Sequence, residues 1–247
     1  MARDHRPSHR RARLAVATSV AALTLGAATL AEPPAQAAAK PRGHDVSSHQ
    51  KKVNWAKARK KGSRFVYVKA TESTSYKNPY FTQQYNGARR AGIIRGAYHF
   101  ALPNRSSGRA QASYFVRNGG DWSRDGWTLP PALDIEYNPY SKAKCYGMSK
   151  AGMVSWIKSF SAETRRRTGR YPVIYTNARW WRLCTGNSRA LAAKHPLWLA
   201  HYSRSAGPLP AGWSFYTFWQ YDNGGRLPGD QNLFNGSMTQ LRRFAKG

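Results

Sequence analysis

Acidic residues are scarce in this chain. Eleven Asp and Glu stand against 40 Lys and Arg, and the formal net charge at pH 7 is +29. A charge of this size predicts a polyanionic partner. Nucleic acid is the usual partner of such a protein inside a cell, but the sequence has no zinc-finger spacing, RNP motif or helix-turn-helix pattern. We therefore expect no nucleic-acid partner. Which other polyanion the protein meets depends on whether it stays in the cell or is exported.

The first 39 residues have the order of a secretory signal peptide. Arg-rich residues 3–13 precede an uncharged apolar run from Leu14 to Leu30, and small residues near 37–39 suit cleavage. The run is short and rich in Ala and Thr for a membrane span, so we favour export over a membrane anchor. Arg10-Arg11 also fits a twin-arginine signal. A secreted protein of this charge is expected to meet anionic cell-wall polymers.

Cysteine is almost absent. The chain has two, Cys145 and Cys184, and an even count in an exported protein predicts one disulfide. The loop it closes spans about 40 residues, for which the chain-entropy model gives at most about 4 kcal/mol of stabilisation. Two cysteines without further ligands nearby do not indicate a metal site, and a nucleophilic cysteine needs a positioned base. The pair is therefore expected to be structural.

Internal repeats and Pro/Ser-rich linkers are also missing after Gly43, so residues 40–247 are expected to form one domain. Short apolar runs alternate with stretches of helical pattern. The expected strands are 43–46, 65–69, 93–100, 131–136, 173–176, 197–200 and 215–221. The expected helices are 55–61, 79–91, 108–118, a long one capped by Ser149 that runs through Arg167, and a short one at the C-terminus.

Strands that alternate with helices over about 200 residues predict a parallel α/β fold. A single closed β/α barrel fits this length, and it would be irregular in its second half because the helical segments become short after Val173. A doubly wound open sheet is the alternative. The absence of a G-x-G-x-x-G motif after the first strand counts against a dinucleotide site on such a sheet.

Several of the few carboxylates lie at positions where a charge that only improves solubility is not expected. Asp134 and Glu136 end an otherwise apolar strand. Residues i and i+2 of a strand project to the same face, and at the carboxyl end of a barrel strand that face is the active-site mouth. Residues 40–247 contain nine carboxylates: Asp45, Glu72, Asp121, Asp125, Asp134, Glu136, Glu163, Asp222 and Asp230.

Two carboxylates held close together cannot both ionise freely, so one keeps its proton to higher pH. Glycoside cleavage needs such a pair, with an acid to protonate the leaving oxygen and an anion to stabilise the oxocarbenium-like centre. The structural alternative is an acidic strand end that binds a Lys, an Arg or a metal. Lys69 is better placed to pair with a neighbouring carboxylate than to act as a nucleophile.

A set of motifs in order resembles glycoside hydrolase family 25, the bacterial N-acetylmuramidase lysozymes. The similarity runs from Gly43 nearly to the C-terminus, and the order of the motifs makes it specific. The matching segments are GHDVSSHQ (43–50), FVYVKATE (65–72), GIIRGAYHF (92–100), PALDIE (131–136), YPVIYT (171–176), LWLAHY (197–202), WQY (219–221) and GDQNLF (229–234).

The resemblance implies a β/α barrel with fewer than eight helices and a groove at the carboxyl ends of the strands. It implies that Glu136 is the general acid/base, and that Asp134 orients the substrate's own N-acetyl group for attack on the anomeric carbon. Asp45 and Asp230 match the family's other active-site carboxylates. The implied reaction is hydrolysis of the β-1,4 bond between N-acetylmuramic acid and N-acetylglucosamine in peptidoglycan, with no metal or cofactor.

Aromatic side chains are expected to line the groove, because sugar faces stack on such rings. For the two tryptophans among them, packing in the core is an equal alternative. The candidates are Tyr98, Tyr137, Trp198, Tyr202, Trp219 and Tyr221.

Two rival functions stay open beside the lysozyme hypothesis. One is a non-catalytic wall-binding or antimicrobial protein that acts through its positive charge. The other is a chitinase-like hydrolase of N-acetylglucosamine polymers. We expect a monomer in each case.

Overall fold

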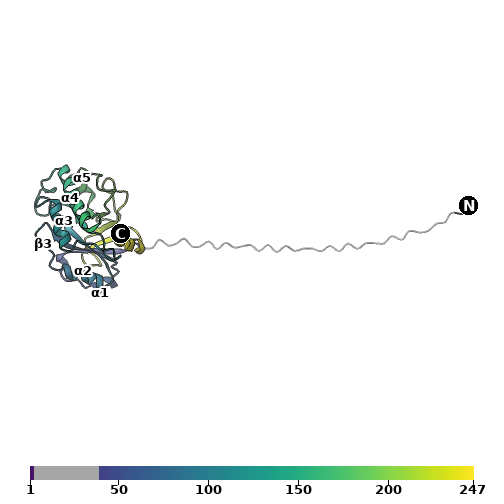
Figure 1. Cartoon of the computed structure of the whole chain (residues 1–247). Coiled ribbons are helices and arrows are strands. Elements are labelled where there is room, and N and C mark those ends of the chain that lie inside the picture. The colour runs from purple at the N-terminus through teal and green to yellow at the C-terminus, as the bar shows by residue number, and fades with distance from the viewer. Residues whose placement is uncertain (3–38) are drawn as a thin grey trace. The chain divides into compact units, whose positions relative to one another are not determined.

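The computed structural model describes residues 1–2 and 39–247 (Figure 1). The predicted signal peptide lies almost wholly outside the described residues. The chain divides into two units, Met1–Ala37 and Ala38–Gly247, and the fold is that of the second. No helix among the described residues is long and apolar enough to cross a membrane.

A nine-stranded sheet forms the centre of this unit, in the order β1-β9-β8-β7-β6-β5-β4-β2-β3. A further pairing of β1 with β2 closes eight of the strands into a ring and leaves β3 on the outside. The bounds are β1 Arg42–Val46, β2 Phe65–Glu72, β3 Tyr76–Lys77, β4 Ile94–Phe100, β5 Ala132–Asp134, β6 Val173–Thr176, β7 Leu197–Ala200, β8 Phe218–Asp222 and β9 Asp230–Phe234.

The ring confirms the predicted irregular barrel and excludes the doubly wound open sheet, since an open sheet has two free edges. Every pairing within the ring is parallel except the two that β9 makes with β1 and β8. The irregularity therefore lies in the second half, where β9 follows β8 with no helix between them.

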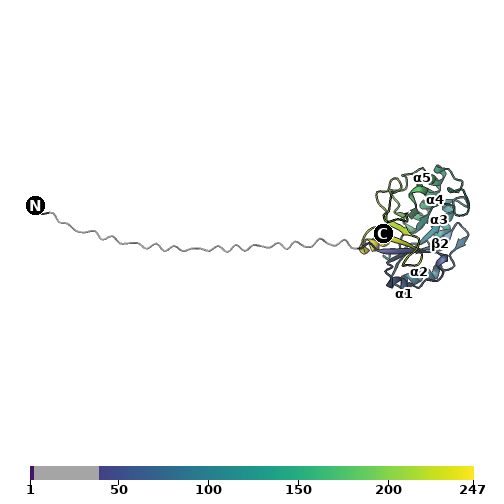
Figure 2. The same ribbon diagram turned by 180° about the vertical axis from the view of Figure 1, so that it is seen from behind.

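Six α-helices and one short 3-10 helix accompany the strands in the described part of the chain. They are η1 Ser48–Gln50, α1 Trp55–Lys60, α2 Phe81–Arg90, α3 Gly108–Arg117, α4 Lys150–Thr168, α5 Ala178–Thr185 and α6 Met238–Lys246. Figures 1 and 2 show α3, α4 and α5 grouped on one part of the unit and α1 and α2 on another. Ser149 caps α4 as predicted, accepting a hydrogen bond from the Gly152 N–H at 3.1 Å.

The inside of the barrel is apolar at one end and polar at the other. Phe65, Tyr67 and Phe218 fill the end where most strands begin, and Leu241 of α6 packs against the same cluster. Two residues further along β8, the inward position is the polar Gln220. Packing therefore closes one end of the barrel and leaves polar side chains at the other.

Strand β5 is shorter than predicted. It ends at Asp134, and Glu136 follows it in an irregular segment. The backbone still pairs just beyond the strand, because the Ile135 N–H donates to the Tyr175 carbonyl at 3.1 Å. The two carboxylates therefore do not share a regular strand face, although both reach the same end of the barrel.

Four elements were not predicted: the short η1 and β3, helix α5 and strand β9. Helix α5 is capped by Asn177, whose side chain accepts from the Trp180 N–H, and it ends at Gly186 in the left-handed region with φ of 67°. Strand β9 lacks the β-branched residues that mark a strand, because its inward positions are polar. Strand β8 begins at Phe218, three residues later than predicted.

Candidate active site

A cavity of about 210 Å³ lies at the polar end of the barrel. It brings together the four carboxylates that the motifs singled out. Its lining consists of Asp45, Val46, Ser47, His49, Gln50, Lys69, Tyr98, Phe100, Asp134, Glu136, Tyr175, Trp198, Gln220 and Asp230.

Asp45 and Asp230 face each other across the antiparallel pair of β1 and β9. Side chains at directly opposed positions of such a pair project to one face within a few ångströms of each other. Gly229, with φ of 76°, makes this approach possible, because a Cβ there would collide with the backbone oxygen of Asp45. Burial, and after it the charge of Asp230, raises the pKa of Asp45 to about 8.

Two amides hold the Asp45 carboxylate in place. Gln220 Nε2 donates to its Oδ2 at 2.9 Å, and Asn232 Nδ2 donates to the same oxygen at 2.7 Å. Trp198 Nε1 in turn donates to Asn232 Oδ1 at 2.7 Å. A donor behind the Asn232 oxygen fixes which end of that amide faces the carboxylate.

The Gln220 amide is fixed in the same way. Its Oε1 accepts hydrogen bonds from the hydroxyls of Tyr175 at 2.8 Å and Tyr202 at 3.0 Å. These contacts orient the Gln220 N–H group toward Asp45. These hydrogen bonds are present without a substrate, as a preorganised site requires.

Asp134 and Glu136 form the second pair of acids. Burial, and after it the charge of Asp230, raises the pKa of Glu136 to about 7. Burial and then the charge of Glu136 raise the pKa of Asp134 well above its usual range. The buried Oδ1 of Asp134 has no hydrogen-bond partner among the described residues. An acid that holds its proton near neutrality thus stands beside three other carboxyl groups.

Lys69 is the one Lys or Arg among the described residues that line this cavity. Its Nζ donates to Glu72 Oε2 and lies 4.7 Å from the centre of the Phe100 ring. Its charge lowers the pKa of Asp134 and Glu136, but burial and the other carboxylates outweigh it. Lys69 is therefore paired with a carboxylate outside the central four.

A family model described as Glycosyl hydrolases family 25 matches residues 44–230. The chain belongs to glycosyl hydrolase family 25. It is therefore a glycoside hydrolase of the lysozyme type, and the resemblance drawn from the motifs is confirmed.

Named relatives agree with the family model. Lysozyme M1 of Streptomyces globisporus is 52% identical over 209 residues, which cover 83% of this chain and 71% of the relative. The N,O-diacetylmuramidase of a Chalaropsis species is 49% identical over 210 residues, covering 83% and 99% of the two chains. The structure of a family 25 lysozyme from Aspergillus fumigatus superposes with a TM-score of 0.83 at 50% identity, covering 85% of this chain and all of that one.

The six aromatic candidates of this family 25 chain fall into three groups. Tyr98 and Trp198 line the cavity, where they are 8% and 2% exposed. Trp198 stacks on Tyr67 with ring centres 4.8 Å apart, so it also belongs to the barrel core. Tyr202 stands at the edge and reaches the cavity through its bond to Gln220.

The other three aromatic candidates lie outside the lining of this cavity. Trp219 and Tyr221 flank Gln220 on β8 and project to the opposite face of the strand. Trp219 is buried there and donates its Nε1–H to the His201 carbonyl at 2.8 Å. Tyr137 lines a neighbouring cavity.

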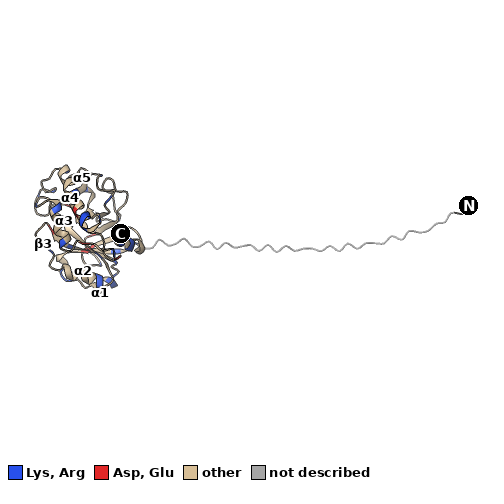
Figure 3. Ribbon diagram, in the orientation of Figure 1, with Lys and Arg blue, Asp and Glu red and all other residues tan. Residues whose placement is uncertain are grey.

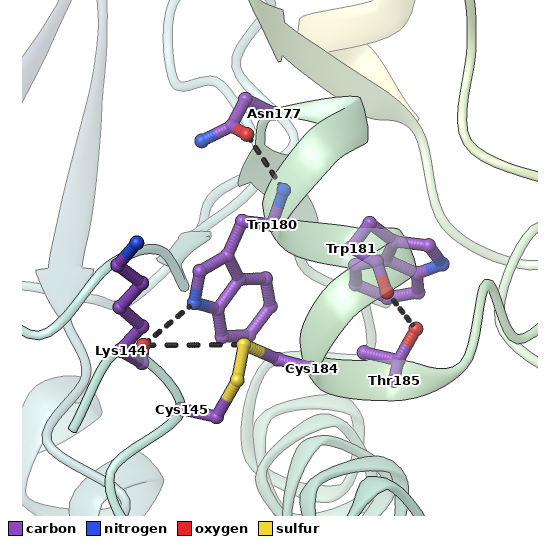
Figure 4. The surroundings of a disulfide bond; sticks show 7 residues. All are labelled: Lys144, Cys145, Asn177, Trp180, Trp181, Cys184 and Thr185. Atoms are coloured by element: carbon purple, nitrogen blue, oxygen red, sulfur yellow. Dashed lines mark hydrogen bonds between the residues drawn. A yellow bond between two sulfur atoms is a disulfide. The ribbon is translucent and has the colours of Figure 1, made fainter.

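The predicted disulfide is present. Cys145 and Cys184 are bonded, with Cα atoms 5.3 Å apart. The bond joins the loop after β5 to α5, and the Trp180 indole N–H donates to the Lys144 carbonyl beside it at 3.2 Å (Figure 4). Its place is structural, on the outer side of the sheet.

Sequence reasoning missed three polar residues of the site: Tyr175, Gln220 and Asn232. Each lies inside a motif that matches the family, and two signals could have found them. Asn232 stands two residues after Asp230 and shares its face on β9. Gln220 is an uncharged polar residue between two aromatic neighbours, where burial of an amide requires specific partners.

Among the described residues, no group of three or more His, Cys, Asp and Glu is arranged to hold a metal ion. Three buried histidines, His44, His99 and His195, lie outside the cavity lining. Burial lowers the pKa of His99 to about 4, and its ring nitrogens hydrogen-bond with Thr71 and Gln111. Burial likewise lowers the pKa of His44 to about 4.

Proposed function

We propose that this chain is a secreted N-acetylmuramidase that hydrolyses the β-1,4 bonds between N-acetylmuramic acid and N-acetylglucosamine in bacterial peptidoglycan. One observation carries the proposal. Glu136, at the barrel mouth, has its pKa raised to about 7 by burial and by Asp230, and it shares the cavity with Asp134. Family membership supports the reaction class, and the names of the muramidase relatives support the substrate.

Glu136 acts first as the general acid. Its proton passes to the glycosidic oxygen while the bond from that oxygen to the anomeric carbon breaks. The acetamido oxygen of the same sugar forms the new bond to that carbon. Asp134, from the same side of the barrel, orients and stabilises the acetamido group. In the second step Glu136 takes a proton from a water molecule, and the water oxygen bonds to the anomeric carbon as the bond from that carbon to the acetamido oxygen breaks.

The remaining two carboxyl groups, Asp45 and Asp230, are proposed to support Glu136 and Asp134. Asp230 raises the pKa of Glu136 and Asp45 through its charge. The protonated form of Glu136 therefore persists to about pH 7, where an ordinary glutamic acid would be ionised. Asp45, held by Gln220 and Asn232, is assigned to the sugar whose bond is cut.

The positive surface brings the enzyme to its substrate. Figure 3 shows Lys and Arg on α1 and on other helices, and bacterial walls carry anionic polymers. Long-range attraction of this kind raises association rates and weakens as salt is added. Export through residues 1–39 belongs to the same proposal, as does action as a monomer.

The test is Glu136→Gln, with Asp121→Asn as a control that removes a carboxylate far from the cavity lining. We expect the first variant to lose at least about 1,000-fold in kcat on purified peptidoglycan, in line with loss of a general acid, and the control to keep the wild-type rate. Thermal unfolding monitored by circular dichroism checks that both variants are folded. Wild-type turnover in the Glu136 variant would remove this residue from the mechanism.

Identification of the new reducing ends separates the rival functions. Muramic acid at the reducing end is the expected product, whereas N-acetylglucosamine ends would indicate the chitinase-like specificity. Bacterial killing that survives Glu136→Gln but disappears at moderate salt would indicate the non-catalytic wall-binding function.

A further inference from the structure

A second cavity, of about 440 Å³, is lined in part by Tyr137, the residue that follows Glu136 in the chain. It lies between the loop after β5 and helix α5, and both of these segments begin at the carboxyl ends of adjacent parallel strands. Its lining is four basic residues with one aromatic and one aliphatic side chain: Tyr137, Lys144, Lys150, Arg179, Arg182 and Leu183. No Asp or Glu among the described residues contributes to it.

The charges of this cavity are not neutralised from within the protein. None of its four basic side chains forms an ion pair with a carboxylate of residues 39–247. The contrast is with Lys69, which pairs with Glu72, and with Arg166, which pairs with Glu163. A concave site lined by unpaired cations concentrates anions and offers carboxylate or phosphate oxygens several charge-assisted hydrogen bonds.

The two walls of the cavity are fixed to each other. The Cys145–Cys184 disulfide bonds the residue that follows Lys144 to the residue that follows Leu183. The Trp180 indole N–H and the Asn138 backbone N–H both donate to the Lys144 carbonyl. Figure 4 shows this loop lying along α5 at the disulfide. The spacing of the two backbone segments that carry the cations is therefore set before a ligand binds, which lowers the entropic cost of binding.

The cavity also adjoins the catalytic position. Tyr137, on its wall, is the next residue after Glu136, so the two Cα atoms are about 3.8 Å apart. An anionic group carried by the sugar beside Glu136 is the ligand that suits this arrangement of basic side chains. In peptidoglycan that group is the peptide attached to muramic acid, which carries free carboxylates.

We propose that the cavity lined by Lys144, Lys150, Arg179 and Arg182 is a subsite for the carboxylates of the peptide attached to the substrate's muramic acid. This assignment rests on the proposed function. It makes the enzyme prefer glycan strands that carry peptides over bare strands, through contacts that begin one residue from the proposed acid.

The test compares kcat/KM on two substrates, glycan strands with their peptides and the same strands after an amidase has removed the peptides and left only the lactyl carboxylate on each muramic acid, which we call bare strands. Lys144→Ala/Arg182→Ala removes one cation from each wall. The matched control, Lys142→Ala/Arg189→Ala, removes two exposed cations from the same two regions of the chain but outside the cavity lining. Both variants change net charge equally, so a general electrostatic effect on binding is the same in each.

We expect the cavity variant to lose about tenfold in kcat/KM on the peptide-bearing strands and to match the wild type on the bare strands, since two exposed charge contacts are lost. The control should match the wild type on both. If Arg182 is replaced by Lys instead of Ala in this variant, much of the loss in kcat/KM on the peptide-bearing strands should be recovered, because Arg182→Lys keeps the positive charge. Unchanged turnover of bare strands also reports that the variant is folded.

Three results would overturn the assignment. One is an equal loss on both substrates, and another is an equal loss in the cavity and control variants. The third is a loss seen only on walls that carry phosphate polymers, which would make phosphate the ligand. A wild-type protein that cleaves neither substrate would instead contradict the proposed function, so the two failures are distinguishable.

Discussion

Two glutamates of this enzyme have opposite surroundings, and the contrast explains how a cationic protein keeps an acid protonated. Glu163, on α4, accepts hydrogen bonds from the side chains of Arg166, Arg167 and Ser113. The bond from Arg166 is the main cause of a pKa held well below the usual range of a glutamic acid. Glu136 has carboxyl groups for neighbours, and its pKa is raised to about 7.

The difference follows from the fold and not from the overall charge. Helix α4 places Arg166 and Arg167 three and four positions after Glu163, where side chains of a helix meet. A carboxylate inside the barrel has a basic neighbour only where a strand places a Lys or Arg at an inward-facing position. Among the described residues that line the mouth, only Lys69 is a Lys or Arg, and it is paired with Glu72. An excess of surface cations therefore leaves the mouth acidic.

The largest effect that would sharpen this comparison concerns Asp134. Asp134→Asn removes the carboxyl group that is proposed to orient and stabilise the acetamido group, and we expect kcat to fall by at least about 100-fold with little change in KM. Steady-state kinetics on peptidoglycan fragments measure both constants. Turnover like that of the wild type would mean that the second carboxylate of the pair is not used in the reaction.

The next effect is on stability at Glu163. Glu163→Gln leaves Arg166 and Arg167 without their anion, and we expect a loss of about 2 kcal/mol in the free energy of unfolding at pH 7 with unchanged kcat. Since the pKa of Glu163 is lowered on folding, its contribution is present above the unfolded-state pKa and disappears as pH falls through the folded one. Urea unfolding at pH 7 and pH 3 measures it. Equal stability of variant and wild type at pH 7 would contradict this account.

The smallest effect has the opposite sign and concerns Asp45. Folding raises its pKa to about 8, so between pH 4 and 8 the folded state binds more protons than the unfolded state and stability falls as pH rises. Asp45→Asn removes this dependence. We expect the variant to be more stable than the wild type by about 1 kcal/mol at pH 8 and to match it near pH 4. A variant less stable than the wild type at pH 8 would contradict the raised pKa of Asp45.

The sequence alone predicted much of the fold. The pattern of apolar runs located seven of the barrel strands, and Ser149 located the start of α4, because these signals are local. Strand β9 was missed because a strand that lines a polar cavity lacks an apolar face, as Asn232 shows. Helix α5 was missed although Asn177 and Gly186 mark its two ends.

The site was predicted through carboxylates, because an acid in an apolar strand is conspicuous. What the sequence could not supply was the side of the sheet to which each aromatic residue of β8 projects. A motif that reads Trp-Gln-Tyr draws attention to Trp219 and Tyr221, yet the inward position belongs to Gln220. The pairing of Asp45 with Asp230 depends on the register between the first and last strands of the barrel, which no local pattern reveals.

The most direct test is a pH titration of the glutamate side-chain carboxyls by NMR, in protein labelled with ¹³C at Glu Cδ. The full chain has four glutamates, Glu32, Glu72, Glu136 and Glu163, so the Glu136→Gln variant assigns the signal. We predict an apparent pKa of about 7 for Glu136, with Glu163 ionised throughout the range from pH 4 to 8. A Glu136 signal that titrates near 4.5, the ordinary value, would contradict the claim that the barrel mouth holds this acid protonated.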